Sequence, residues 1–285
     1  MKQITNETGN DQFLTSKNLL TNDQHRAISH PQEPHFAAVL LLDTASSMDG
    51  PNIRQLNEGM QTLKEEISND ELARKRVELA VVTFGNGGVN VINDFSAIEN
   101  FKPPTLVADG GTPMGEGILK AMDLIEIRKQ DYKKVGVNYY RPLIFMITDG
   151  YPTDMEPGDS MWNTVVKKVH DGETNRKFSF FVVGVDSANM DLLKQIAPPA
   201  RVPLRLKEGM WKKMFAWLSN SQREDSQQNP GDQISLENPT GPTGWAIIPI
   251  ENTNVEETVK GKIEEVAKDS NERFSHRNLG WQEIL

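Results

Sequence analysis

Hydrophobic positions in this chain fall into short runs that are separated by polar stretches. Six runs are rich in aliphatic and aromatic residues: 36–43 (FAAVLLLD), 77–85 (VELAVVTFG), 89–95 (VNVINDF), 142–149 (PLIFMITD), 178–186 (FSFFVVGVD) and 202–206 (VPLRL). Several of them are apolar at consecutive positions, which is typical of strands buried on both faces, as in a parallel sheet. Each run therefore predicts a strand.

Between these runs the apolar residues recur with the period of a helix. Ile53, Leu56, Met60, Leu63 and Ile67 follow one another at spacings of 3, 4, 3 and 4, which places them on one helical face. Similar patterns predict helices near 118–125, 162–169, 189–197 and 209–219. Strands that alternate with helices indicate an α/β fold with a doubly wound, mostly parallel, Rossmann-like sheet of about six strands.

One connection breaks this alternation. The Asn-Gly-Gly sequence at 86–88 directly joins the predicted strands 77–85 and 89–95. This composition is typical of a tight hairpin turn, so we expect one edge strand of the sheet to be antiparallel.

Changes in composition and hydrophobic pattern divide the chain into three parts. Residues 1–34 are polar without a clear period and predict a flexible N-terminal arm. Residues 35–220 contain the strand and helix patterns and predict the folded domain. Residues 221–285 predict an acidic linker rich in Pro and Gly, followed by an amphipathic helix at 255–266. That helix either docks on the domain or binds a partner.

Composition narrows the range of partners and compartments. The net charge of −9 argues against a nucleic-acid partner, because phosphate contacts need a basic surface. No apolar stretch reaches the roughly 18–20 residues that span a bilayer, and the N-terminus lacks the apolar region of a secretory signal. The chain has no cysteine, so we expect a cytoplasmic protein without disulfides or thiolate metal sites.

Three polar loops are candidates for a ligand site. Two of them directly follow predicted strands, and one directly precedes a predicted helix. In an open α/β sheet, ligands bind beyond the carboxyl ends of the strands, near the point where the strand order reverses. We expect the three loops at this edge of the sheet, namely residues 43–47, 109–117 (DGGTPMGEG) and 148–150 (TDG). The glycines of the second loop do not match a phosphate-binding Walker motif and predict a tight turn instead.

Side chains of an extended segment alternate, so Asp43, Ala45 and Ser47 are expected on one side of the first loop. With the Thr112 hydroxyl and the Asp149 carboxylate, they supply two carboxylates and two hydroxyls. Hard oxygen ligands of this kind suit Mg²⁺ or Mn²⁺, which keep water at the remaining octahedral positions. The sequence therefore predicts a metal site of Asp43, Ser47, Thr112 and Asp149 that could accept a carboxylate from outside.

These motifs resemble those of von Willebrand factor type A (vWA) domains, specifically the bacterial cytoplasmic branch linked to tellurite resistance and stress. LLLDTASSM corresponds to Asp-x-Ser-x-Ser, GGTPMGEG to the threonine loop and FMITDGYPTD to the last aspartate. The resemblance covers about residues 35–220. It implies a doubly wound fold with a metal-ion-dependent adhesion site (MIDAS), whose ligands, direct or through water, would be the four residues named above.

Ala45 departs from the family pattern, which has a metal-binding Ser at this position. A lost ligand worth about 1.4 kcal/mol would weaken metal affinity tenfold, whereas water could fill the vacant position. A weakened site and one that still fills at cellular Mg²⁺ concentrations both remain open. Asp154, in the same loop as Asp149, is expected to serve as a turn or cap residue, with support of the metal ligands as the alternative.

The resemblance implies a non-enzymatic interaction module in a bacterial stress-response or defence complex. A protein partner would complete the metal shell with an Asp or Glu carboxylate. The alternative is a Mg²⁺-dependent phosphoryl-transfer hydrolase, since an aspartate at a strand end also opens haloacid-dehalogenase-type enzymes. Those enzymes need a second Asp two residues later, where this chain has Ala45.

Overall fold

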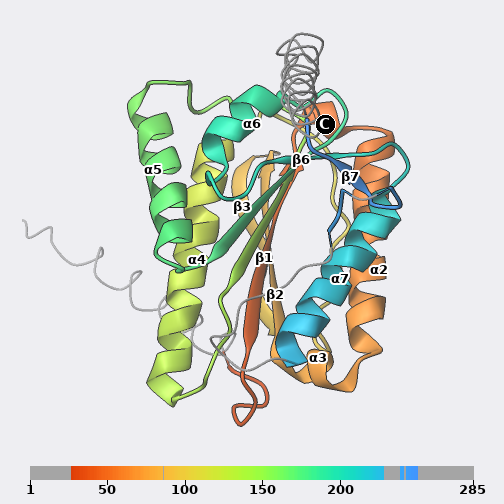
Figure 1. Ribbon diagram of the computed structural model, residues 1–285, viewed down its shortest axis with the longest axis vertical. Coiled ribbons are helices and arrows are strands. Elements are labelled where there is room, and N and C mark those ends of the chain that lie inside the picture. The colour runs from red at the N-terminus through yellow and green to blue at the C-terminus, as the bar shows by residue number, and fades with distance from the viewer. Residues whose placement is uncertain (1–26, 86, 228–237, 241, 250–285) are drawn as a thin grey trace, which may run out of the picture. The chain divides into compact units, whose positions relative to one another are not determined.

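Figure 1 shows the computed structural model, which describes residues 27–85, 87–227, 238–240 and 242–249. In this part of the chain, seven strands form one sheet in the order β3-β2-β1-β4-β5-β6-β7. The strands are β1 (Phe36–Thr44), β2 (Val77–Gly85), β3 (Gly88–Ala97), β4 (Leu143–Thr148), β5 (Ser179–Gly184), β6 (Leu204–Leu206) and β7 (Ala246–Ile247). The α/β fold predicted from the sequence is confirmed, and each of the six predicted strands is present.

Strand order places the switch point of the sheet between β1 and β4. The pairs β1–β2, β1–β4, β4–β5 and β5–β6 are parallel, and the chain leaves β1 in one direction toward β2 and returns on its other side as β4. β3 pairs antiparallel with β2, as the Asn-Gly-Gly turn predicts. Ligand sites of doubly wound sheets lie at such a switch point.

Helices cover both faces of the sheet. On one face lie α2 (Pro51–Ser68), α3 (Glu71–Arg76) and α7 (Trp211–Gln227), and on the other lie α4 (Met114–Val135), α5 (Ser160–Thr174) and α6 (Met190–Ile196) (Figure 1). Alternate β1 residues enter two separate apolar cores, Leu40 and Leu42 on the α2 face and Val39 and Leu41 on the α4 face. This two-sided burial explains why β1 is apolar at consecutive positions. No helix among the described residues is long and apolar enough to cross a membrane.

β7 is a seventh strand, which the sequence patterns do not predict. It pairs antiparallel with β6, so both edges of the sheet are antiparallel. Trp245, just before β7, is 1% exposed and packs edge-on against Trp217 of α7 with ring centroids 5.3 Å apart. A segment whose composition predicts a linker therefore contributes to the core. Residues 1–26 of the predicted arm and the predicted helix at 255–266 lie outside the described residues, and the domain boundaries stay predictions.

Close packing of α2 against α7 depends on Gly59. A Cβ atom at this position would lie 2.1 Å from the Phe215 ring, which is fully buried. We expect Gly59→Ala to lower the free energy of unfolding by about 1–3 kcal/mol through overpacking. Urea unfolding would measure this change, and adding Phe215→Leu should recover part of it. An unchanged unfolding midpoint for Gly59→Ala would contradict this account of the interface.

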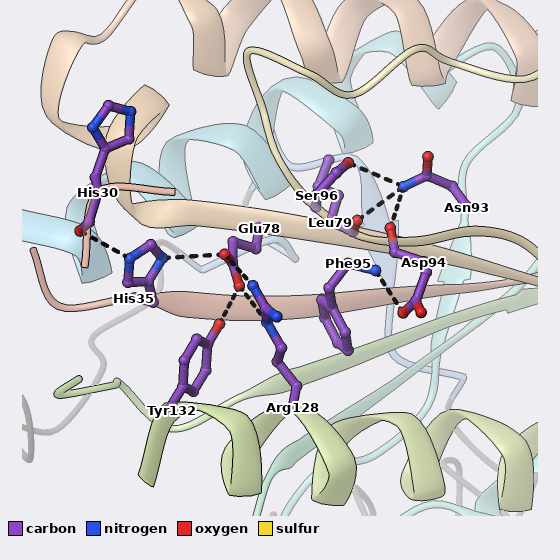
Figure 2. A network of polar contacts seen from close by, with 10 residues as sticks. All are labelled: His30, His35, Glu78, Leu79, Asn93, Asp94, Phe95, Ser96, Arg128 and Tyr132. Carbon is purple, nitrogen blue, oxygen red and sulfur yellow. Dashed lines mark hydrogen bonds and ion pairs between the residues drawn. The ribbon is translucent and has the colours of Figure 1, made fainter. Parts of the chain in front are cut away.

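A buried polar network lies at the opposite end of β2 from the switch point (Figure 2). The Glu78 carboxylate accepts hydrogen bonds from Arg128 Nε at 2.7 Å and Nη2 at 2.5 Å, and another from the Tyr132 hydroxyl. His35 Nδ1 lies 3.4 Å from Glu78 Oε1, and the His35 and Tyr132 rings stack. All four side chains are buried. The network therefore ties β2 to α4 and to the start of β1.

Candidate metal centre

The candidate site is built where β1 and β4 end side by side. Leu42 of β1 pairs with Ile147 of β4, so the next residues, Asp43 and Thr148, also lie next to each other. Asp149 follows immediately after β4. The carboxyl ends of the two strands thus bring two carboxylates to the switch point, as the sequence predicts.

Asp43 is held by hydrogen bonds to both of its carboxylate oxygens. Oδ2 accepts from Thr148 Oγ1 at 2.5 Å, and Oδ1 accepts from the Ala45 N–H at 2.8 Å. The side chain of Asp43 is fully buried. These contacts fix the direction of the carboxylate before any ligand arrives.

Ser47 reaches the site through a turn and not through the alternation of side chains along a strand. The expectation of an extended 43–47 segment is wrong, because the chain turns into the 3₁₀ helix η2 (Ser46–Met48) directly after Ala45. Ser47 Oγ nevertheless donates a hydrogen bond to Asp149 Oδ1 at 2.7 Å. The turn, and not strand alternation, therefore brings Ser47 to Asp149.

Gly150 marks the point on which the predicted ligands converge. A Cβ atom at this position would lie 3.4 Å from Thr112 Oγ1, 3.6 Å from Ser47 Oγ and 3.7 Å from Asp43 Oδ2. Three of the four predicted ligand side chains thus surround the place that any larger residue at 150 would fill. Asp149 joins them through its bond with Ser47, so all four predicted residues are brought together.

Electrostatics of the site favour a cation. Burial raises the pKa of Asp43 to about 7, and the Asp149 carboxylate adds to the shift, while hydrogen bonds from Thr148 and Ala45 oppose it. Burial also raises the pKa of Asp149, assisted by the charge of Asp186 and opposed by Ser47. Neither Asp43 nor Asp149 forms an ion pair with another described residue. A divalent cation would supply the missing positive charge.

The oxygen set fits Mg²⁺ or Mn²⁺. Ligands in adjacent positions of an octahedron with metal–oxygen distances of about 2.1 Å lie roughly 3.0 Å apart. The 2.7 Å between Ser47 Oγ and Asp149 Oδ1 is close to this spacing. No group of three or more His, Asp or Glu side chains that could hold a metal occurs among the described residues, so a cation here would depend on hydroxyls and water as well as on two carboxylates.

The loop that carries Thr112 is attached to the end of β1. Asp109 N–H donates to Thr44 O at 2.9 Å, and Ser46 N–H donates to Gly110 O at 3.0 Å. Gly110 has φ +75°, a left-handed conformation that favours glycine, and the chain bends at this residue. Gly115 and Gly117 lie inside α4, where Gly117 packs closely on Phe84, so they do not form a phosphate-binding loop.

Three further residues support the site, and two of them carry no recognisable sequence signal. Thr148 orients Asp43, and Thr153 exchanges hydrogen bonds with the backbone of Thr112. Asp154 accepts from the N–H groups of Gly115 and Glu116, which confirms its expected role as a cap residue. The helix that Asp154 caps begins some 40 residues earlier in the chain, a pairing that local sequence patterns do not reveal.

Comparison with known proteins identifies the family and agrees with the fold. The von Willebrand factor type A domain family matches residues 38–210, which is more than half of the chain. The pilus adhesin SpaC from Lactobacillus rhamnosus GG, in an open conformation, is similar in fold, with a TM-score of 0.51 and 14% identity. That match covers 68% of this chain and 30% of SpaC, so the chain spans less than a third of the adhesin.

Two further solved structures have lower TM-scores. The vWF domain of the type V pili tip protein Mfa5 from Porphyromonas gingivalis has a TM-score of 0.48 at 11% identity, over 72% of this chain and 99% of that domain. The SpRpn10 VWA domain has a TM-score of 0.44 at 12% identity, over 63% of this chain and 93% of that domain. No curated protein sequence matches the chain.

Proposed function

Because the chain belongs to the von Willebrand factor type A domain family, we propose that it is a metal-dependent protein-interaction module and not an enzyme. The observation that carries this proposal is the convergence of Asp43, Ser47, Thr112 and Asp149 around Gly150. These residues would hold Mg²⁺ or Mn²⁺ and leave one position to an Asp or Glu carboxylate of a partner protein. The bound cation would supply the positive charge that joins the two proteins.

The cellular setting is part of the same proposal. A bacterial cytoplasmic complex for stress response or defence, of the tellurite-resistance type, fits the motifs and the absence of cysteine. Nucleic acid is not the expected partner, given the net charge of −9.

Metal-dependent capture tests the function. The protein, immobilised in Mg²⁺, should retain a partner that EDTA and the variant Asp149→Asn both release. The captured protein would then be purified and its acidic residues replaced one at a time, with loss of binding expected at a single Asp or Glu. Equal retention in Mg²⁺ and EDTA would contradict the proposal.

The hydrolase alternative predicts a different result. Such an enzyme would turn over phosphate esters in Mg²⁺ and lose this activity in Asp43→Asn. The position of its second aspartate holds Ala45, which is 2% exposed and has no side-chain oxygen. Turnover that depends on Asp43 would replace the interaction proposal.

Ala45→Ser is expected to strengthen metal binding about tenfold, the effect of one added ligand worth about 1.4 kcal/mol. The reason is that family members carry a ligand hydroxyl at this position. Calorimetric titration with Mn²⁺ and with Mg²⁺ would measure the two affinities, with Ser46→Ala as a control at the exposed neighbouring position. Equal affinities of wild type and Ala45→Ser would show that water already replaces the missing hydroxyl fully.

A further inference from the structure

We propose that Asp154 couples the metal centre to the N-terminus of α4, so that metal occupancy and the first turn of this helix stabilise each other. The inference rests on the proposed metal site and assigns a positioning role to a residue that does not reach the converging ligand oxygens. It also predicts how occupancy of the site is transmitted into the fold.

α4 cannot satisfy its own first N–H groups with a local side chain. Its N-cap residue is Pro113, which makes no side-chain cap hydrogen bond. Asp154 supplies the acceptors instead, with Oδ1 3.1 Å from Gly115 N and Oδ2 2.8 Å from Glu116 N. A carboxylate at this place is also favoured by the positive end of the helix dipole. The start of α4 therefore depends on a residue from the loop after β4.

The neighbouring residue, Thr153, fixes the metal ligand that precedes α4. Thr153 N–H donates to Thr112 O at 2.8 Å, and Thr112 N–H donates to Thr153 Oγ1 at 3.0 Å. Both backbone polar groups of Thr112 are thus held by one residue. Thr153 and Asp154 together form a clamp that sets the position of the Thr112 hydroxyl.

The same loop carries a second metal ligand. Asp149 and Asp154 are five positions apart, so the clamp places the loop that carries Asp149 relative to Thr112. The loop packs closely against the first turn of α4, because a Cβ atom at Gly115 would lie 2.9 Å from Met155 Sδ and 3.1 Å from Asp154 Oδ2. Met155 is itself buried. Loosening the clamp would therefore allow the ligands from the two loops to separate.

A cation that binds both loops must favour the clamped arrangement. By linkage, whatever the clamp adds to metal affinity the metal returns to the stability of the clamp. Replacing a residue that orients metal ligands without binding the metal itself typically weakens metal affinity ten- to a hundredfold. We expect Asp154→Ala to lie in this range, although Asp154 is not placed as a ligand.

The first test compares two aspartates that each cap a helix. Asp159 caps α5 and accepts from Trp162 N at 2.6 Å and from Glu156 N at 2.8 Å, so its hydrogen bonds stay within its own loop and helix and do not join that loop to the one that carries Thr112. In calorimetric titration with Mn²⁺, Asp154→Ala should weaken binding about ten- to a hundredfold, and Asp159→Ala less than twofold. Urea unfolding in EDTA should show a lowered unfolding midpoint for both variants, with shifts of similar size.

Asp154→Asn provides a variant that keeps the shape of the side chain and one acceptor oxygen. It should bind Mn²⁺ with an affinity between those of wild type and Asp154→Ala, and circular dichroism would establish that it folds. Equal Mn²⁺ affinities of wild type, Asp154→Asn and Asp154→Ala would overturn the coupling while leaving the metal site itself intact. No Mn²⁺ binding by the wild type would overturn both.

The second test reads the coupling from the helix side. In wild type, Mg²⁺ should slow hydrogen exchange at the N–H groups of Thr112, Gly115 and Glu116, whereas Trp162, capped by Asp159, should not change. In Asp154→Ala this protection at Gly115 and Glu116 should disappear even at Mg²⁺ concentrations that saturate the variant. Mg²⁺-dependent protection that persists there without the Asp154 carboxylate would overturn the proposed route.

Discussion

Arg128→Met is expected to lower the free energy of unfolding by about 3–5 kcal/mol, because it leaves the Glu78 carboxylate buried without its cation. Glu78 and Arg128 are 0% and 1% exposed, and the guanidinium binds both carboxylate oxygens. Tyr132 cannot replace Arg128, because its hydroxyl is a neutral donor to one oxygen only. Burial, together with the charge of Glu78, keeps the pKa of Tyr132 well above its usual value.

A double variant separates loss of the pair from loss of packing. Glu78→Leu combined with Arg128→Met replaces the ions with apolar groups, and should recover most of the stability lost in Arg128→Met. Urea unfolding monitored by tryptophan fluorescence measures wild type and both variants. If Arg128→Met were as stable as wild type, the network in Figure 2 would not contribute to the fold.

Residue patterns predict the sheet well because each strand run reflects burial on both faces. β1 and β4 are apolar at consecutive positions, and both lie in the middle of the sheet. β7 escapes prediction because it has only two residues and follows a segment rich in Pro and Gly. Its place is set by tertiary contacts, chiefly Trp245 against Trp217, which no local period records.

Metal-site residues could be named from the sequence where strand ends supply them. Asp43 and Asp149 follow from the rule that ligands collect at the carboxyl ends of parallel strands. Ser47 was named on an incorrect premise, since the chain turns into η2 where an extended segment was expected. Glu78 and Arg128 were not predicted at all, because charged residues carry no signal of burial until their partners are known.

The residues that position the metal ligands also cannot be recognised from local sequence patterns. Thr148 looks like the last residue of a strand, and only the pairing of β1 with β4 reveals that it donates to Asp43. Thr153 and Asp154 act on residues about 40 positions earlier. The sequence therefore predicts which residue types can bind the metal, whereas the contacts that position them are seen only in the folded chain.

Asp43→Asn is expected to stabilise the metal-free protein at neutral and alkaline pH while abolishing metal binding. In the folded protein the pKa of Asp43 is raised from its ordinary value of 3.8 to about 7, chiefly by burial. The folded state therefore binds the proton more tightly than the unfolded state, and the stability contributed by this carboxyl falls as the pH rises from about 4 to 7. Asparagine is neutral throughout, so the variant avoids this loss.

Urea unfolding in EDTA at pH 5 and pH 8 measures the effect. The stability advantage of Asp43→Asn over wild type should grow by about 2–3 kcal/mol between the two pH values. Asp123→Asn, at an exposed position on α4, serves as the control and should show no such trend. An advantage that does not change with pH would mean that Asp43 titrates normally.

Saturating Mg²⁺ should reverse the order at pH 8. The cation neutralises the two carboxylates and stabilises wild type by mass action, about 4.1 kcal/mol at a concentration one thousand times the Kd, which exceeds the advantage that the variant gains between pH 5 and pH 8. Asp43→Asn lacks the anionic ligand and should not respond. The charge that makes the site costly to the empty protein would then be the charge that binds the metal, and a variant stabilised equally by Mg²⁺ would place the cation elsewhere.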